Sequence, residues 1–171
     1  MGFHRMVVRQ ALVITLEQYF GAKKHPIEHL ANANMLLGQV NLCLYKAEKD
    51  GCYDGWIDPD TNSQISGAKG GSGDGGYRTP DSRTGGAGST HRSARAVDVF
   101  DPNRILAQWC VKNKATLVDL GLWCEDFRYT PVWCHFQDIA PKSGKRIYIP
   151  YVGPPLAPAL EGQDPIPFTV K

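Results

Sequence analysis

The sequence shows no strong excess of charge of either sign and no long apolar run. Its 19 basic and 17 acidic side chains leave a formal net charge of +2, so no basic footprint indicates binding to nucleic acid. No apolar stretch approaches the roughly 20 residues that a membrane helix requires. We therefore expect neither nucleic acid nor a membrane among the partners of this protein.

The chain also lacks any Cys-x-x-Cys pair. Its five cysteines are odd in number and irregularly spaced: Cys43, Cys52, Cys110, Cys124 and Cys134. This spacing supports neither a zinc ribbon nor a thioredoxin-like redox motif. We expect reduced, mostly buried thiols in a protein made in the cytosol.

The N-terminus lacks the full pattern of a secretory signal. Arg5 and Arg9 precede a short apolar stretch at residues 11–14, but no small-residue cleavage site follows before Glu17. We expect this stretch to belong to the fold, and the protein to be made in the cytoplasm without a signal peptide.

The composition is that of an ordinary globular protein. With 171 residues, 42% of them hydrophobic and 21% charged, the chain is long enough to bury a core without disulfides or a structural metal. We predict one domain over residues 1–150. Residues 151–171 are rich in proline, which predicts an extended tail.

Local signals place helices in the first part of the chain. Residues 15–18 have the spacing of a capping box, which predicts a short helix that ends at Gly21. Pro26 suits the first turn of a longer helix, which should end near Asp50. Apolar residues at steps of three and four, or their sum, predict its buried face: Ile27, Leu30, Leu37, Val40 and Leu44.

Strands are expected in the second part of the chain, after a glycine-rich loop region at residues 58–90. One further helix is expected, with Asp101-Pro102 at its start and Gly121 at its end. The expected strands are residues 96–100, 122–124, 132–136 and 146–149. Helices first and strands later predict an α+β domain, a small antiparallel sheet with flanking helices.

Three residues of metal-ligand type lie in or near these strands: His91, Asp98 and His135. A catalytic zinc needs about three such ligands and leaves one position for water. His91 and Asp98 are seven residues apart. A regular strand would point them to opposite faces, so the segment between them must bend to bring both to one metal. By spacing alone, a structural role beside aromatic residues is the more common outcome for such histidines.

Longer motifs around these residues add to the argument. They occur in this order: Gly76-Tyr77-Arg78-Thr79-Pro80, Gly85-Gly86-Ala87, Ser89-Thr90-His91 through Ala96-Val97-Asp98, and Trp133-Cys134-His135-Phe136-Gln137. Together they resemble the M15 family of zinc peptidases, the D-Ala-D-Ala carboxypeptidases and L-alanyl-D-glutamate endopeptidases. The pattern is most similar to the compact members encoded by phages. The resemblance covers roughly residues 15–150.

The resemblance implies an α+β fold of the hedgehog and D,D-peptidase type and Zn²⁺ as the cofactor. The zinc ligands it implies are His91, Asp98 and His135. Arg78 matches an arginine that binds a substrate carboxylate and so contributes to catalysis, and Ser89 matches a serine near the substrate. Gln137 is expected on the same sheet face as His135, within hydrogen-bonding reach of the site.

The implied activity is zinc-dependent hydrolysis of an amide bond in peptidoglycan stem peptides. Both an endopeptidase and a carboxypeptidase fit the resemblance. Such a protein would be made in the cytoplasm of a bacterial host and would act at the cell wall or as part of a phage virion.

Two positions depart from the family pattern. Ala94 replaces the motif glycine, which matters only if that residue needs a positive φ angle. Val132 occupies the position where many members have a Glu or Asp base. A zinc hydrolase still needs a carboxylate for proton transfer. Glu125 is our candidate and Asp126 the alternative, although a solvated surface turn would equally explain a glutamate at position 125.

Two other classes of function stay open. A catalytically weak or inactive M15-like domain could serve as a virion structural component or a cell-wall-binding module, with the tail at residues 151–171 contacting other virion proteins. Val132 and the tail motivate this alternative. A soluble domain without a metal is the outcome if the motif match is a coincidence.

Overall fold

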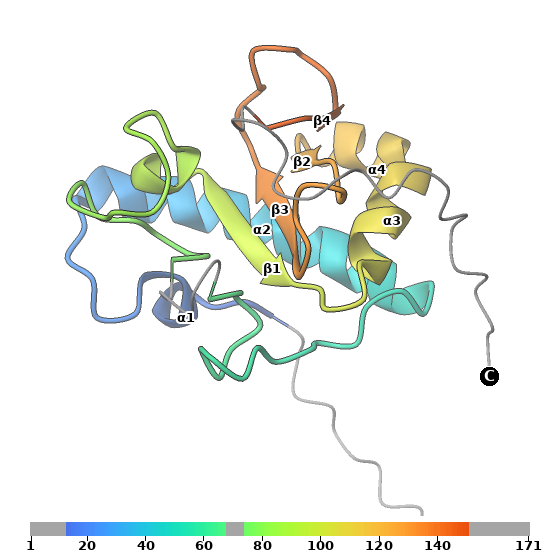
Figure 1. The fold of residues 1–171 in the computed structure, drawn as a ribbon, viewed down its shortest axis with the longest axis horizontal. Helices are drawn as coiled ribbons and strands as arrows, with labels where there is room; N and C mark the ends of the chain where they lie inside the picture. Colours follow the sequence, from blue (N-terminus) through green and yellow to red (C-terminus); the bar gives the residue numbers. More distant parts are fainter. Residues whose placement is uncertain (1–12, 68–73, 151–171) are drawn as a thin grey trace, which may run out of the picture.

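The computed structural model describes residues 13–67 and 74–150 (Figure 1). The expectations for the N-terminal segment up to residue 12 and for the proline-rich tail at residues 151–171 therefore lie outside the described residues. Ile14, at the end of the apolar N-terminal stretch, is buried, and its backbone N–H donates to the Asn41 side chain. This part of the stretch belongs to the fold, as expected.

The first two helices have the expected bounds. α1 spans Leu16–Phe20, with a complete capping box from Thr15 and a C-cap at Gly21. α2 spans Ile27–Lys49, directly after Pro26, and ends at Asp50. These ends are set by local side-chain and backbone chemistry, which is why the sequence alone predicted them.

The buried face of α2 differs from the prediction at its N-terminal end. Leu37, Val40 and Leu44 are buried as expected, whereas Ile27 is 83% exposed. The buried residues of the helix begin only at Ala33, so its first turn extends past the core. A periodic apolar pattern does not show at which residue of the helix the contact with the core begins.

Four short strands form one sheet: β1 (Ala96–Phe100), β2 (Trp123–Glu125), β3 (Trp133–Gln137) and β4 (Ile147–Tyr148). The strand order is β1-β3-β2-β4. β3 runs antiparallel to both of its neighbours, whereas β4 runs parallel to β2, so the sheet is mixed. The α+β class is confirmed, and the antiparallel arrangement holds for the first three strands in this order.

The helix expected between β1 and β2 is two helices. α3 spans Ile105–Lys112 and α4 spans Lys114–Asp119. The break falls at Asn113, whose backbone and side-chain N–H groups both donate to the Trp109 carbonyl oxygen. An asparagine that bonds the backbone in this way competes with helix continuation.

Asp101 caps α3 from four residues before the helix begins. Its buried carboxylate accepts hydrogen bonds from the backbone N–H groups of Leu106 and Ala107, at 3.3 and 2.9 Å. The capping role was expected, but the helix starts at Ile105 rather than at Pro102.

Asp101→Ala is expected to destabilise the protein by about 1–3 kcal/mol, because two buried N–H groups lose their acceptor. Denaturant unfolding measures this change. Asp119→Ala, which removes an exposed carboxylate in α4, serves as the control and should change stability by less than about 0.5 kcal/mol. Equal unfolding curves for the two variants would contradict the capping role.

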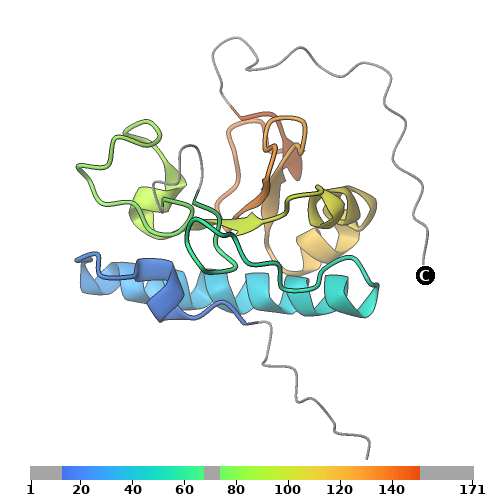
Figure 2. The ribbon, with the colours of Figure 1, turned by 60° about the horizontal axis from the view of Figure 1, so that its bottom comes forward.

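The core lies between the sheet and α2, which runs along one face of the sheet (Figure 2). Side chains alternate between the two faces of a strand. The core side of β1, β2 and β3 carries Val97, Val99, Cys124, Cys134 and Phe136. Alternation therefore directs Asp98, Glu125, His135 and Gln137 to the other face.

The described part of residues 58–89 contains no helix or strand, as the glycine-rich composition predicted. Among the described helices, none combines the length and apolar character needed to cross a membrane.

Candidate metal centre

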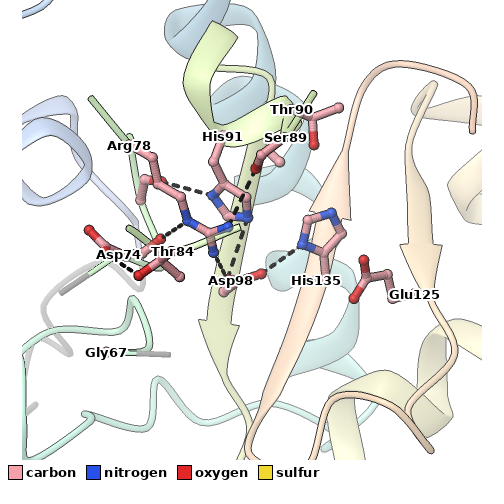
Figure 3. Close-up of polar contacts among 12 residues, drawn as sticks. Gly67, Asp74, Arg78, Thr84, Ser89, Thr90, His91, Asp98, Glu125 and His135 are labelled. Carbon is pink, nitrogen blue, oxygen red and sulfur yellow. Dashed lines mark hydrogen bonds and ion pairs between the residues drawn. The ribbon is translucent and has the colours of Figure 1, made fainter. Parts of the chain in front are cut away.

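The pairing of strands aligns four polar side chains in one row across the sheet. Asp98 of β1 pairs directly with His135 of β3. Trp123 pairs with Gln137 and Cys124 with Phe136, so one further step in this register brings Glu125 opposite His135. Glu125 in turn pairs with Tyr148 of β4. Figure 3 shows Asp98, His135 and Glu125 next to one another in this order.

His91 reaches the same place from a turn of 3₁₀ helix, η2 (Thr90–Ser93), that precedes β1. Ala94 then adopts a left-handed conformation, with φ 57° and ψ 37°, and reverses the chain. The predicted bend between His91 and Asp98 is confirmed. Ala94, which replaces the glycine of the family motif, therefore has a positive φ. Glycine is favoured in this conformation, and a Cβ costs roughly 1–2 kcal/mol.

The three predicted ligands converge and are buried. His91 Nε2 lies 3.4 Å from Asp98 Oδ2, and His135 Nδ1 lies 2.7 Å from Asp98 Oδ1. The ligand atoms of the three residues all lie within 4.8 Å of one another. His91 is 2% exposed, Asp98 is 1% exposed and His135 is 5% exposed. The three residues predicted as ligands thus come together from η2, β1 and β3.

The outer nitrogen of each histidine contacts an oxygen acceptor. His91 Nδ1 lies 2.8 Å from the Gly76 carbonyl oxygen, and His135 Nε2 lies 3.3 Å from Gln137 Oε1. A contact with such an oxygen places an N–H on that ring atom, so His91 Nε2 and His135 Nδ1 are the nitrogens that face Asp98. His135 Nδ1 is within hydrogen-bond distance of Asp98 Oδ1, so a proton occupies this position in the metal-free site. A cation could replace that proton and bind both nitrogens and the carboxylate.

The pKa values reflect this convergence. Burial lowers the pKa of His91. Burial also opposes protonation of His135, but the negative charges of Glu125 and Asp98 raise its pKa to about 9. Burial alone would raise the pKa of Asp98, yet His91 and His135 hold it below its usual range. The cluster therefore attracts positive charge, as a proton or as a metal ion.

Gly76, the first residue of the Tyr77-Arg78 motif, fits because it has no side chain. A Cβ at this position would collide with the Tyr19 carbonyl oxygen. The close approach places the Gly76 carbonyl against His91 Nδ1. This explains in physical terms why a glycine stands at this position of the motif.

Arg78 lies within the cluster and is only 8% exposed. Its Nη2 donates to Asp98 Oδ2 at 3.1 Å, its Nε to the Asp74 carbonyl oxygen at 2.7 Å, and its Nη1 to Ser89 Oγ at 3.4 Å (Figure 3). The structure thus brings Arg78 and Ser89 to the ligands. A guanidinium has five N–H donors, and these contacts use one on each of its three nitrogens.

The two candidate bases have different surroundings. Glu125 is half-buried; its Oε1 accepts from the Tyr148 hydroxyl at 3.4 Å, and burial raises its pKa. Asp126 is held by Arg128, with contacts of 2.9 and 2.6 Å, and this ion pair overcomes the effect of burial and lowers its pKa. The geometry favours Glu125, because its carboxylate stands in the row with His135.

Gln137 is the centre of a hydrogen-bond network beside the ligands. Its Oε1 accepts from Tyr148 Oη at 2.7 Å and from Thr90 Oγ1 at 3.3 Å, in addition to His135 Nε2. The expected contact between Gln137 and the site is confirmed. Tyr148 was missed, since the sequence indicated only a short strand there and its position follows from the parallel pairing of β4 with β2.

Gln137→Ala is expected to weaken metal binding about 10- to 100-fold, because His135 Nε2 loses the acceptor that orients its ring. Zinc competition against a chelator of known affinity measures the change. Thr90→Val serves as the control, since it removes one donor to Gln137 and leaves the contact with His135 in place. Wild-type affinity in the alanine variant would contradict this role.

Comparisons of the chain with protein family models, curated proteins and solved structures found no match. The function is therefore argued from the motifs and the geometry of the site.

Proposed function

We propose that this protein is a zinc-dependent hydrolase that cuts an amide bond in peptidoglycan stem peptides, as an endopeptidase or a carboxypeptidase similar to the M15 family. One observation carries the proposal: His91 Nε2, Asp98 and His135 Nδ1 converge while both outer nitrogens contact oxygen acceptors. Two neutral imidazoles and one carboxylate are a ligand set typical of catalytic zinc, which leaves one position open.

The position of Ala94 supports the resemblance to the M15 family. Its backbone has a φ of 57°. The family motif has glycine at this position, and glycine is the residue that such a conformation favours. The shared bend between the first two ligands thus accounts for the motif glycine in physical terms.

Zinc at these ligands would supply a bound water of lowered pKa and would polarise the scissile carbonyl. Glu125 is proposed as the general base that accepts the proton of the attacking water and passes it to the leaving amine. Burial raises its pKa, which makes the carboxylate a stronger proton acceptor. The Tyr148 hydroxyl lies 3.4 Å from its Oε1 and shares its single proton between Glu125 and the closer Gln137, so it helps to orient the carboxylate.

Arg78 is proposed to bind a carboxylate of the stem peptide with its two remaining N–H groups, which a planar guanidinium can present side by side. Its Nη1 contacts Ser89 Oγ, which places the serine beside the same part of the substrate. The Arg78 guanidinium also contacts Asp98, so it holds this proposed zinc ligand in place.

The test of this function is hydrolysis of purified muropeptides by the zinc-loaded protein, followed by mass spectrometry. We expect one amide bond to be cut, activity to disappear after chelation, and activity to return when zinc is added. The mass of the products identifies the bond. No cleavage of any muropeptide by zinc-loaded, folded protein would refute the enzymatic function.

The second candidate function is a catalytically weak M15-like domain that acts as a virion component or binds the cell wall. Val132 favours it, because a 39% exposed apolar side chain stands where many family members have a carboxylate. Zinc-dependent retention on insoluble peptidoglycan without release of peptides would support this candidate. Both candidates place the protein at the cell wall or in a phage virion.

A further inference from the structure

Four of the five cysteines gather on the core side of the sheet, behind the metal centre. Cys43 comes from α2, Cys110 from α3, Cys124 from β2 and Cys134 from β3. All four are at most 1% exposed, and none forms a disulfide. Burial of single thiols is ordinary packing. Convergence of four thiols from four separate elements needs a further reason.

The sulfur atoms are close enough to share one ion. The Sγ atoms of Cys110, Cys124 and Cys134 lie within 4.8 Å of one another, and Cys124 and Cys134 are 3.5 Å apart. The Cys43 thiol lies beside that of Cys110, but its sulfur is not among the three that lie within 4.8 Å of one another. Tetrahedral coordination with metal–sulfur bonds of about 2.3 Å separates the sulfurs by roughly 3.8 Å. Three sulfurs are thus already at distances close to those of tetrahedral coordination, and Cys43 would have to move nearer to complete it.

We propose that Cys110, Cys124 and Cys134, with Cys43 as the fourth ligand, form a second metal site that binds a thiophilic divalent cation such as zinc. The site is structural, because four protein sulfurs leave no position for water or substrate. It is independent of the proposed hydrolase function, which uses histidine and carboxylate ligands on the other face of the sheet.

A metal at this site would fix the strands that carry the hydrolase residues. Cys124 precedes Glu125 on β2, and Cys134 precedes His135 on β3. A common ion would lock the register that places Glu125 opposite His135. Because the thiols are fully buried, the ion must enter as the chain folds.

Cadmium is the probe, because its bonds to thiolates absorb in the ultraviolet and its bonds to imidazole and carboxylate do not. The full chain is refolded with Cd²⁺ present and freed of excess ion, and cadmium is counted by elemental analysis. We expect two cadmium ions per chain and a strong thiolate-to-cadmium band. Cys124→Ala should hold the second ion more weakly and show a reduced band, because one thiolate ligand is missing, and Cys110→Ala should do the same.

Cys52→Ala is the matched control. Its thiol is also buried but lies outside the cluster, next to the Asp50 carbonyl oxygen, so this variant should keep the full band. Circular dichroism of the metal-free variants shows which of them fold, and the band is compared among those. If no variant of the four clustered cysteines folds, the presence or absence of the thiolate-to-cadmium band in refolded wild-type protein tests the proposal.

Absence of the band from refolded wild-type protein would overturn the proposal, as would equal bands in the Cys52 variant and in folded cluster variants. Failure of the hydrolase proposal would give a different set of results. In that case the band would persist while the second cadmium ion and the hydrolysis of muropeptides were missing.

Discussion

His135→Ala is expected to lose one zinc ion per chain and to reduce hydrolysis by at least about 10³-fold, since the metal contributes several kcal/mol to the transition state. The variant removes the nitrogen that lies 2.7 Å from Asp98 Oδ1. Elemental analysis of protein purified without a histidine tag measures the zinc, and muropeptide turnover measures the activity.

The matched control is His25→Ala. His25 is exposed and stacks on Phe20, with ring centroids 3.7 Å apart, far in sequence from the motifs. It should keep wild-type zinc content and turnover. If the His135 variant kept its full zinc and activity while folded, the metal centre would have to lie elsewhere and the hydrolase proposal would fail.

Local chemistry explains which parts of the fold could be predicted from the sequence. The capping box at Thr15 and the helix after Pro26 depend on contacts within a few residues, and both appear where expected. The break between α3 and α4 was not predicted. It falls at Asn113, whose side chain bonds the Trp109 carbonyl oxygen beside its own backbone N–H, and apolar periodicity does not report such a contact.

The motifs single out His91, Asp98 and His135 and predict that they meet, but the strand register that brings them together could not be predicted. Nothing within β1 or β3 specifies that Asp98 pairs with His135, because register is set by long-range packing of the whole sheet. The same holds for Glu125. It reaches the row only through the pairing of β2 with β3, whereas its sequence context equally suited an exposed turn.

Tyr148 is the clearest example of a residue beside the site that the sequence alone does not reveal. Its strand has two residues and pairs in parallel with β2, a pairing that needs a long connection and leaves no short-range signal. Its hydroxyl nevertheless contacts both Gln137 and Glu125. A residue of this kind can be recognised only once the sheet has been assembled.

Glu125→Gln is expected to lower kcat by about 10²- to 10⁴-fold, because an amide cannot accept the proton of the attacking water. Zinc content should be unchanged, since Glu125 is not among the converging ligands. The amide side chain of this variant would still offer an oxygen to Tyr148, so the fold of β2 and β4 should be retained. Single-turnover hydrolysis of muropeptides by zinc-loaded protein measures the loss.

Asp126→Asn is the matched control, one residue further along the chain. Arg128 already holds this carboxylate, with contacts of 2.9 and 2.6 Å, so the variant should keep nearly all turnover. The reverse result, with Asp126→Asn inactive and Glu125→Gln active, would make Asp126 the base. Full activity in both variants would mean that neither carboxylate transfers the proton. In that case the base must come from another residue, since Val132 offers no group that can accept a proton.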